Sequence, residues 1–155
     1  MSTTVTWGIN STSSEQTEQL AEKLGHNLRG GEIIELVSDL GGGKTTFTRG
    51  LVRGAGSTDR VRSPTFTLSS EYKTPKFTVA HFDFYRLGEA GIVADELAEV
   101  IGDPNYVVVV EWGDIVHDVL PADRLTIRLN LTGENARNLN FEYPPELEYL
   151  LGDLK

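Results

Sequence analysis

A strand, a glycine-rich turn and a helix start follow one another in residues 32–46, and this combination constrains the fold more than any other segment. The run Ile33–Val37 is apolar and strand-like, and Gly41-Gly42-Gly43 leads directly into Lys44-Thr45-Thr46. Glycines lack a Cβ atom, so their backbone N–H groups can approach a polyanion, and the following helix adds its positive N-terminal end. The segment therefore predicts a phosphate-binding loop at the end of a strand.

The residue types in this loop predict its contacts with a nucleoside triphosphate. In P-loops the lysine reaches the β- and γ-phosphates and the next hydroxyl binds Mg²⁺, which assigns these roles to Lys44 and Thr45. The pattern G-x-x-x-x-G-K-[ST] also has a glycine where this chain has Ser38, and serine is a poorer fit wherever φ must be positive. A glycine-rich turn that binds nothing is the alternative. The residues expected to line the phosphates are Leu40, Gly41, Gly42, Gly43, Lys44, Thr45 and Thr46.

Composition limits the classes of function. The 155 residues predict one domain, residues 1–155, and the absence of cysteine excludes disulfides, thiol catalysis and Cys-ligated zinc. Fourteen basic and 23 acidic residues give a net charge of −9, which disfavours unaided binding to nucleic acid or anionic lipid. This charge suits either a basic protein partner or simple solubility. The N-terminus resembles no secretory signal and no apolar run is long enough to span a bilayer, so we expect a cytoplasmic protein.

Strand-like and helix-like segments alternate along the chain, which predicts an α/β fold of the single-domain, P-loop NTPase-like, three-layer type. We expect a mixed sheet with a parallel centre, to which a hairpin and the last two strands add antiparallel pairs. The expected strands are Val5–Ile9, Ile33–Val37, Thr65–Tyr72, Phe77–Phe82, Tyr106–Val110, Leu125–Leu131 and Asn138–Tyr143. The expected helices are 14–28, 44–54, 90–101 and 114–120, with a final helical turn at 146–151.

A second functional segment is Val107–Val110 followed by Glu111. Four consecutive β-branched residues predict a central strand, and the carboxylate then falls at the edge of the sheet. P-loop NTPases place there an acid that holds Mg²⁺, directly or through water. A buried strand that ends in an acid is often structural, but next to a P-loop it predicts that Glu111 lies on the Mg²⁺ side of the site.

A third segment, residues 81–87, brings Asp83 to the end of another strand. Aromatic neighbours would bury the surroundings of this carboxylate and could raise its pKa towards that of a general base. Arg86 could compensate charge on the γ-phosphate. An Asp–Arg pair that only caps a strand is equally compatible with the sequence, and His81 is more typical of a packed strand histidine than of a catalyst.

Two weaker signals complete the set. The segment Arg62-Ser63-Pro64-Thr65 offers hydroxyl groups on a loop made rigid by proline, as in switch segments that sense the γ-phosphate. Trp112 follows Glu111 and could stack on a base or a partner, although core packing is the more common role of such a residue.

Four motifs together resemble the TsaE (YjeE) family of small bacterial P-loop ATPases, over nearly the whole chain and at the same spacing. Tyr85-Arg86-Leu87 and Glu111-Trp112 are the specific elements, because generic P-loop proteins lack them. The four motifs are Gly41-Gly42-Gly43-Lys44-Thr45-Thr46-Phe47, Ser63-Pro64-Thr65-Phe66, His81-Phe82-Asp83-Phe84-Tyr85-Arg86-Leu87 and Val110-Glu111-Trp112.

The resemblance implies a protein of the tRNA threonylcarbamoyladenosine pathway that binds ATP or ADP with Mg²⁺ and hydrolyses ATP slowly in isolation. It also implies docking on the TsaB–TsaD complex, which transfers threonylcarbamoyl to an adenosine of the tRNA anticodon loop, so contact with tRNA would be indirect. ATP turnover would reset that complex between cycles.

Carried over motif by motif, the resemblance assigns a role to individual residues. It makes Asp83 the catalytic carboxylate and Thr65 the switch threonine, while Lys44 and Thr45 bind phosphate and Mg²⁺ and Glu111 is the Mg²⁺-side acid. It also places Arg137, in Gly133-Glu134-Asn135-Ala136-Arg137, near the adenine. Many members of the family carry glycine at the position of Ser38.

Two other functions are compatible with the loop. A small-molecule kinase would share it but usually adds an arginine-rich lid and an acceptor pocket, and neither is evident in this sequence. A nucleotide-dependent switch without meaningful catalysis would need only the binding loop. The chain has no Asn-Lys-x-Asp segment of the kind that reads guanine, which favours ATP over GTP.

Overall fold

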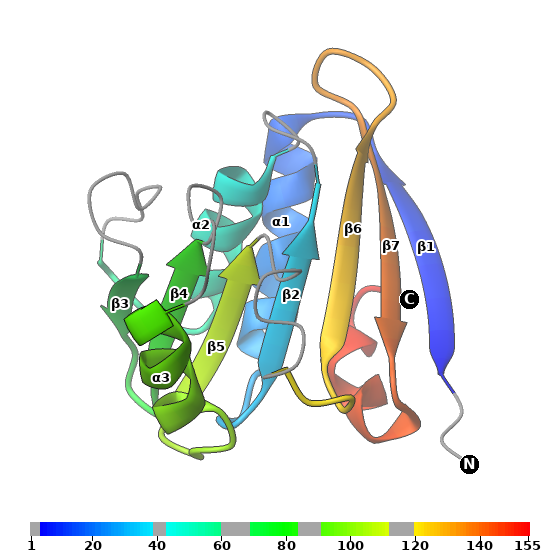
Figure 1. Cartoon of the computed structure of the whole chain (residues 1–155). Helices are drawn as coiled ribbons and strands as arrows, with labels where there is room; N and C mark the ends of the chain where they lie inside the picture. The colour runs from blue at the N-terminus through cyan, green and yellow to red at the C-terminus, as the bar shows by residue number, and fades with distance from the viewer. Residues whose placement is uncertain (1–3, 39–42, 60–68, 84–90, 112–119) are drawn as a thin grey trace.

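A seven-stranded sheet forms the centre of the protein, in the order β1-β7-β6-β2-β5-β4-β3 (Figure 1). The computed structural model describes residues 4–38, 43–59, 69–83, 91–111 and 120–155. The strands are β1 Val5–Ser11, β2 Ile33–Val37, β3 Ser69–Lys73, β4 Thr78–Asp83, β5 Tyr106–Glu111, β6 Leu125–Leu131 and β7 Arg137–Tyr143. The helices are α1 Ser14–His26, α2 Lys44–Gly54, α3 Gly91–Val100 and the 3-10 segment η2 Pro145–Leu151.

The centre of the sheet is parallel and both sides are antiparallel, as the sequence predicts. Strand β2 pairs in parallel with β5 and β6, and β5 pairs in parallel with β4. Antiparallel pairs join β3 to β4, β6 to β7 and β7 to β1. Because the carboxyl ends of parallel strands meet at one edge of a sheet, β2, β5 and β4 deliver their last residues to the same edge.

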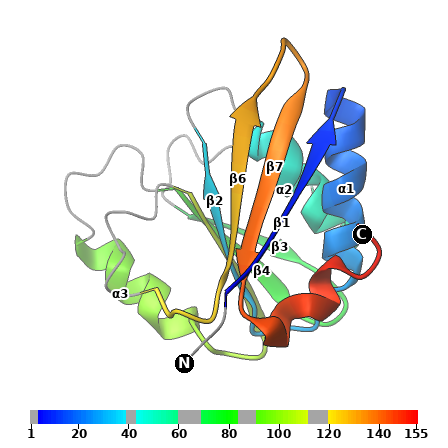
Figure 2. The ribbon, with the colours of Figure 1, turned by 90° about the vertical axis from the view of Figure 1, so that its right-hand side faces the viewer.

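Helices lie on both sides of the sheet (Figure 2), and a hydrophobic core fills each of the two faces, which confirms the predicted three-layer α/β architecture. Helices α1 and α2 and the η2 segment lie on one face, where Leu24, Phe47 and Leu151 join the larger core. Helix α3 covers the other face through Leu97. The parallel strands are buried on both faces, which explains why β5 reads as four valines without alternation.

Close contact between α1 and α2 depends on glycine. Helices usually cross with 8–10 Å between their axes, and small residues at the crossing shorten that separation. A Cβ atom on Gly50 would lie 2.2 Å from the Glu18 carbonyl oxygen, and one on Gly54 would lie 1.9 Å from that of Glu22. On α1, a Cβ atom on Gly25 would lie 2.0 Å from the Leu51 carbonyl oxygen. No side chain fits at these positions without separating the two helices.

A buried carboxylate, Glu35, ties β2 to the segment that enters β6. It is 6% exposed and accepts hydrogen bonds from Arg124 Nε at 3.1 Å and from Thr126 Oγ1 at 3.2 Å. A buried charge is tolerated when it is paired and hydrogen-bonded in this way. The contact joins residues about 90 positions apart in sequence, and it lies on the face opposite Leu36 because side chains alternate along a strand.

A second buried carboxylate, Glu32, connects the start of β2 to the C-terminal segment. It accepts backbone N–H bonds from Arg29 and Gly30 at 2.8 and 2.7 Å, and the Tyr149 hydroxyl donates to it at 2.6 Å. The Arg29 guanidinium also lies 3.8 Å from the centre of the Tyr149 ring. Burial and the hydrogen bond to Glu32 raise the pKa of Tyr149 above its ordinary value, because both penalise the phenolate.

Replacing Tyr149 with phenylalanine should lower the free energy of unfolding by about 1–2 kcal/mol at pH 7, because Glu32 would lose one of its three donors. A pKa raised in the folded state stabilises the protein below the unfolded pKa of 10.0, and this contribution fades as pH rises further. The difference between the two proteins should therefore shrink above pH 10 in urea unfolding. Tyr106→Phe is the control, since the described residues give the Tyr106 hydroxyl no hydrogen bond. An equal loss from both replacements would contradict the prediction.

Two expected elements fall only partly or not at all in the described ranges. The first strand of the predicted hairpin is described from Ser69 onwards, and its expected residues 65–68 lie outside the described residues. Nearly all of the helix expected at 114–120 also lies outside them. Across the residues that are described, no helix has both the length and the apolar character needed to cross a lipid bilayer.

Candidate functional site

The predicted phosphate-binding loop leaves β2 at Ser38 and enters α2 at Lys44. Lys44 is only 8% exposed, and its ammonium donates a hydrogen bond to the Ser38 carbonyl oxygen at 3.2 Å, so the lysine reaches back across the loop that precedes it. Gly43 stands at the N-cap with φ of 100°, a left-handed conformation that favours glycine. The loop therefore ends in a backbone conformation that suits the glycine of the pattern, although the first pattern position is serine.

The N-terminus of α2 lacks the capping that α1 has. In α1, the Ser13 hydroxyl accepts from Gln16 N–H and Glu15 lies in the first turn. In α2, the cap residue provides no side-chain hydrogen bond and the first turn holds no acid. The first N–H groups of a helix need partners, and the helix dipole there attracts negative charge, so this end suits an anion. Thr45 and Thr46 are partly buried in this first turn.

Arg137 reaches this loop from the start of β7. Its Nε atom lies 3.4 Å from where a Cβ atom of Gly43 would be, and only 9% of the residue is exposed. Its guanidinium also donates to the carbonyl oxygens of Glu134 and Ala136 at 3.3 and 2.9 Å, which hold it in place. The structure therefore brings Arg137, 94 positions away in sequence, against Gly43 at the end of the predicted loop. Its place near the adenine stays a prediction.

The two predicted carboxylates occupy matched positions on adjacent parallel strands. Asp83 ends β4 and is the register partner of Glu111, which ends β5, and Glu111 is in turn the partner of Leu36 in β2. Parallel strands lie about 4.8 Å apart, so Asp83 is about 10 Å across the sheet from the strand that carries the loop. Both acids fall on the same sheet edge as Ser38, as predicted from sequence.

Glu111 is buried and hydrogen-bonded to His81. The predicted edge position is correct, but only 4% of Glu111 is exposed, and its carboxylate contacts His81 Nε2 on the neighbouring strand. His81 is fully buried, as expected for a packed strand histidine. The sequence carries no signal for this contact, because the contact depends on which strand lies beside β4 and on the register that sets His81 opposite Val109.

Several predicted site residues cannot be placed. Six of the predicted site residues lie outside the described part of the chain: Leu40, Gly41, Gly42, Thr65, Arg86 and Trp112. Their expected contacts with phosphate, switch loop and partner stay predictions.

The oxygen ligands of the described residues would bind Mg²⁺ only together with the phosphates of a nucleotide. In the part of the chain that the structure describes, no group of three His, Cys, Asp or Glu side chains is arranged to hold a metal ion. Magnesium often binds through one or two protein oxygens together with substrate phosphates and water. The Thr45 hydroxyl and the Glu111 carboxylate fit that donor set.

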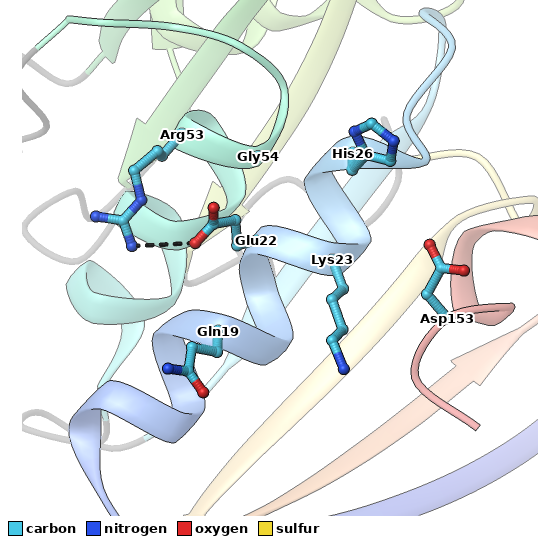
Figure 3. A pocket seen from close by; sticks show the side chains of 7 residues that line it. All are labelled: Gln19, Glu22, Lys23, His26, Arg53, Gly54 and Asp153. Carbon is cyan, nitrogen blue, oxygen red and sulfur yellow. Dashed lines mark ion pairs between the residues drawn. The ribbon is translucent and has the colours of Figure 1, made fainter.

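A surface pocket lies at the opposite end of α2 from Lys44 (Figure 3). Its walls come from the second half of α1, the end of α2 and the C-terminal segment. The side chains are charged or polar, and Arg53 pairs with Glu22 at 3.4 Å. It contains none of the predicted site residues, and it is lined by Gln19, Glu22, Lys23, His26, Arg53, Gly54 and Asp153.

The sheet order, the helices on both faces and the lysine-bearing loop after β2 define an α/β protein with a P-loop NTPase-like fold. Residues 11–139 match the family model described as "Threonylcarbamoyl adenosine biosynthesis protein TsaE". The chain belongs to the TsaE family.

Individual relatives agree with this assignment. The tRNA threonylcarbamoyladenosine biosynthesis protein TsaE of Bacillus subtilis is 34% identical over 132 residues, which cover 82% of this chain and 79% of that protein. The Aquifex aeolicus protein of the same name is 36% identical over 129 residues, covering 82% and 89%. The crystal structure of Bacillus subtilis YdiB superposes with a TM-score of 0.78 at 31% identity, over 99% of this chain and 95% of that one.

Proposed function

We propose that this protein binds ATP with Mg²⁺, hydrolyses it slowly in isolation, and serves the threonylcarbamoyladenosine modification of tRNA. It would act on the TsaB–TsaD complex and reset that complex through ATP hydrolysis. The observation that carries the nucleotide part is the uncapped N-terminus of α2, with buried Lys44, on the sheet edge where Asp83 and Glu111 also end. The names of its relatives support the pathway.

In this proposal, each residue at this sheet edge has a separate role in ATP hydrolysis. The reaction is in-line attack of water on the γ-phosphorus, in which positioning and charge neutralisation supply most of the catalysis. Lys44 would exchange its bond to Ser38 for the β- and γ-phosphates, and the N–H groups of the α2 N-terminus would hold the remaining phosphate oxygens. Arg137, which lies beside Gly43, would contact the bound nucleotide.

The carboxylates would act on the attacking side and the metal side. Asp83 would orient the water and accept its proton, since it ends the strand two places away from the loop strand. Thr45 and Glu111 would hold Mg²⁺, which neutralises phosphate charge when bound. With net charge −9, the protein also has the surface sign that would favour a basic docking face on its partner.

Replacing Asp83 with asparagine should lower the rate of ATP hydrolysis at least 100-fold in the presence of TsaB–TsaD. The change removes a general base but keeps the size of the side chain, so the dissociation constant for ATP should stay within threefold. Phosphate release under single-turnover conditions measures the hydrolysis rate, and calorimetry measures the dissociation constant for ATP. Asp123→Asn, at an exposed position outside the site, is the matched control.

Other results would favour the alternatives. Near-normal hydrolysis by Asp83→Asn would remove Asp83 from catalysis. If the wild-type protein forms ADP only with one added metabolite, and without equivalent phosphate release, the kinase reading is correct. If ATP binds but partners do not accelerate its single turnover, the protein is a nucleotide switch.

A further inference from the structure

The contact between His81 and Glu111 is the least expected feature of the sheet edge. Both side chains are buried, at 0% and 4% exposure, and His81 Nε2 is hydrogen-bonded to one carboxylate oxygen, Oε2. His81 stands opposite Val109 in the parallel register, so Glu111 is two residues further towards the carboxyl edge and on the same face. The histidine thus supports the carboxylate from the side of the core.

The chemistry of this pair gives His81 one specific task. A carboxylate only accepts hydrogen bonds, so Nε2 must carry the proton that it shares with Glu111. The other ring nitrogen, Nδ1, is buried and has no hydrogen-bond partner among the described residues. An Nδ1 atom without a proton leaves only a lone pair unpartnered there, which costs less than a buried unpaired N–H.

A purely structural role explains the pair poorly. A half-satisfied buried polar group is less stable than an apolar side chain of the same shape. The neighbouring residues on this face of β4 and β5, Val79 and Val109, are apolar and fully buried, so an apolar side chain would suit the position. The fold instead keeps a single donor directed at the carboxylate that ends β5.

We propose that His81 is a positioning residue for Glu111. By holding Oε2, it fixes the carboxylate orientation and leaves Oε1 for Mg²⁺ or for a water molecule bound to it. This inference rests on the proposed function. Replacing a residue that hydrogen-bonds to a metal-binding carboxylate typically lowers metal affinity or activity 10- to 100-fold.

The test compares two replacements of His81 by Mg²⁺ titration. His81→Phe keeps a ring of similar size without a donor, whereas the amide of His81→Gln can donate from a similar distance. Calorimetry with a non-hydrolysable ATP analogue gives the Mg²⁺ concentration that half-maximally tightens nucleotide binding. We expect this concentration to rise about tenfold in His81→Phe and to stay within threefold of wild type in His81→Gln. Affinity measured with EDTA should change less than twofold in both.

The matched control is His26→Phe at an exposed position of α1, which should behave as wild type. A folded His81→Phe protein with the wild-type Mg²⁺ dependence would overturn the proposal while leaving the proposed function intact. A wild-type protein that binds no Mg²⁺–nucleotide would overturn both.

A measurement on the unaltered protein covers the case in which His81→Phe does not fold. Nitrogen-15 NMR of the imidazole rings reports which nitrogen carries the proton. We expect His81 to be protonated at Nε2, and its ring signals to move when Mg²⁺ is added to the ADP complex. Signals that stay unchanged on Mg²⁺ addition, or a proton on Nδ1 alone, would overturn the proposal.

Discussion

Replacing Lys44 with alanine is expected to weaken ATP binding at least 100-fold, equivalent to about 2.7 kcal/mol, and to abolish turnover. Hydrogen bonds from a charged donor to phosphate are among the strongest in proteins, and the buried ammonium of Lys44 has no substitute nearby in the first turn of α2. Calorimetry with ATP and Mg²⁺ measures the loss, and a fluorescent nucleotide analogue extends the range to weak binding.

The control for this experiment is Lys76→Ala, which removes an exposed lysine from the turn between β3 and β4 and should leave binding unchanged. Thermal unfolding without nucleotide should stay within a few degrees of wild type, because the alanine variant gives up the bond to Ser38 but no longer has to bury a charged side chain. Unaltered ATP affinity in the Lys44 variant would disprove a phosphate role for this loop.

Replacing Gly54 with valine is expected to lower the free energy of unfolding by about 3–5 kcal/mol. The first atom of the new side chain would lie 1.9 Å from a backbone carbonyl oxygen of α1, and a backbone atom cannot rotate away. The helices must separate, which also opens the core around Leu51. For a domain of this size the midpoint of thermal unfolding should fall by about 10 °C or more.

Gly152→Ala is the matched control, because a Cβ atom there would be 3.7 Å from its nearest neighbour and the backbone φ is −54°. It should leave stability within about 0.5 kcal/mol of wild type. Equal stability of the Gly54 and Gly152 variants would show that the α1–α2 contact is looser than described. A weaker nucleotide affinity in the Gly54 variant would further show that helix separation reaches the loop at the other end of α2.

The architecture could be predicted from sequence because its signals are local. The run Ile33–Val37 before the glycines, and the valines before Glu111, identify strands buried on both faces. Register, by contrast, depends on contacts between distant segments. Nothing in the sequence near Leu125 states that this strand lies beside β2, where the Glu35–Arg124 pair helps to join them.

The residues of the candidate site likewise divide into those that local motifs indicate and those that depend on contacts between distant segments. The positions of Lys44, Asp83 and Glu111 near one sheet edge could be predicted because each belongs to a recognisable motif that follows or ends a strand. The burial of Glu111 against His81 could not, because it depends on which face of two strands meets and on how β4 and β5 are aligned. A histidine in an apolar strand usually indicates only packing, so the sequence offers no reason to pair it with that acid.

The pairing of β2 with β6 has a consequence for how the protein is made. Ile34 of β2 pairs with Leu125 of β6, so this pairing can form only after β6, about 90 residues further along the chain, has been synthesised. Contacts so distant in the chain form slowly and late, since the intervening segment must first be ordered. A nascent polypeptide still attached to the ribosome would therefore carry the glycine-rich segment without the neighbours that shape it. The edge that Gly43, Glu111 and Arg137 share would therefore assemble only after β6 and β7 have also been synthesised.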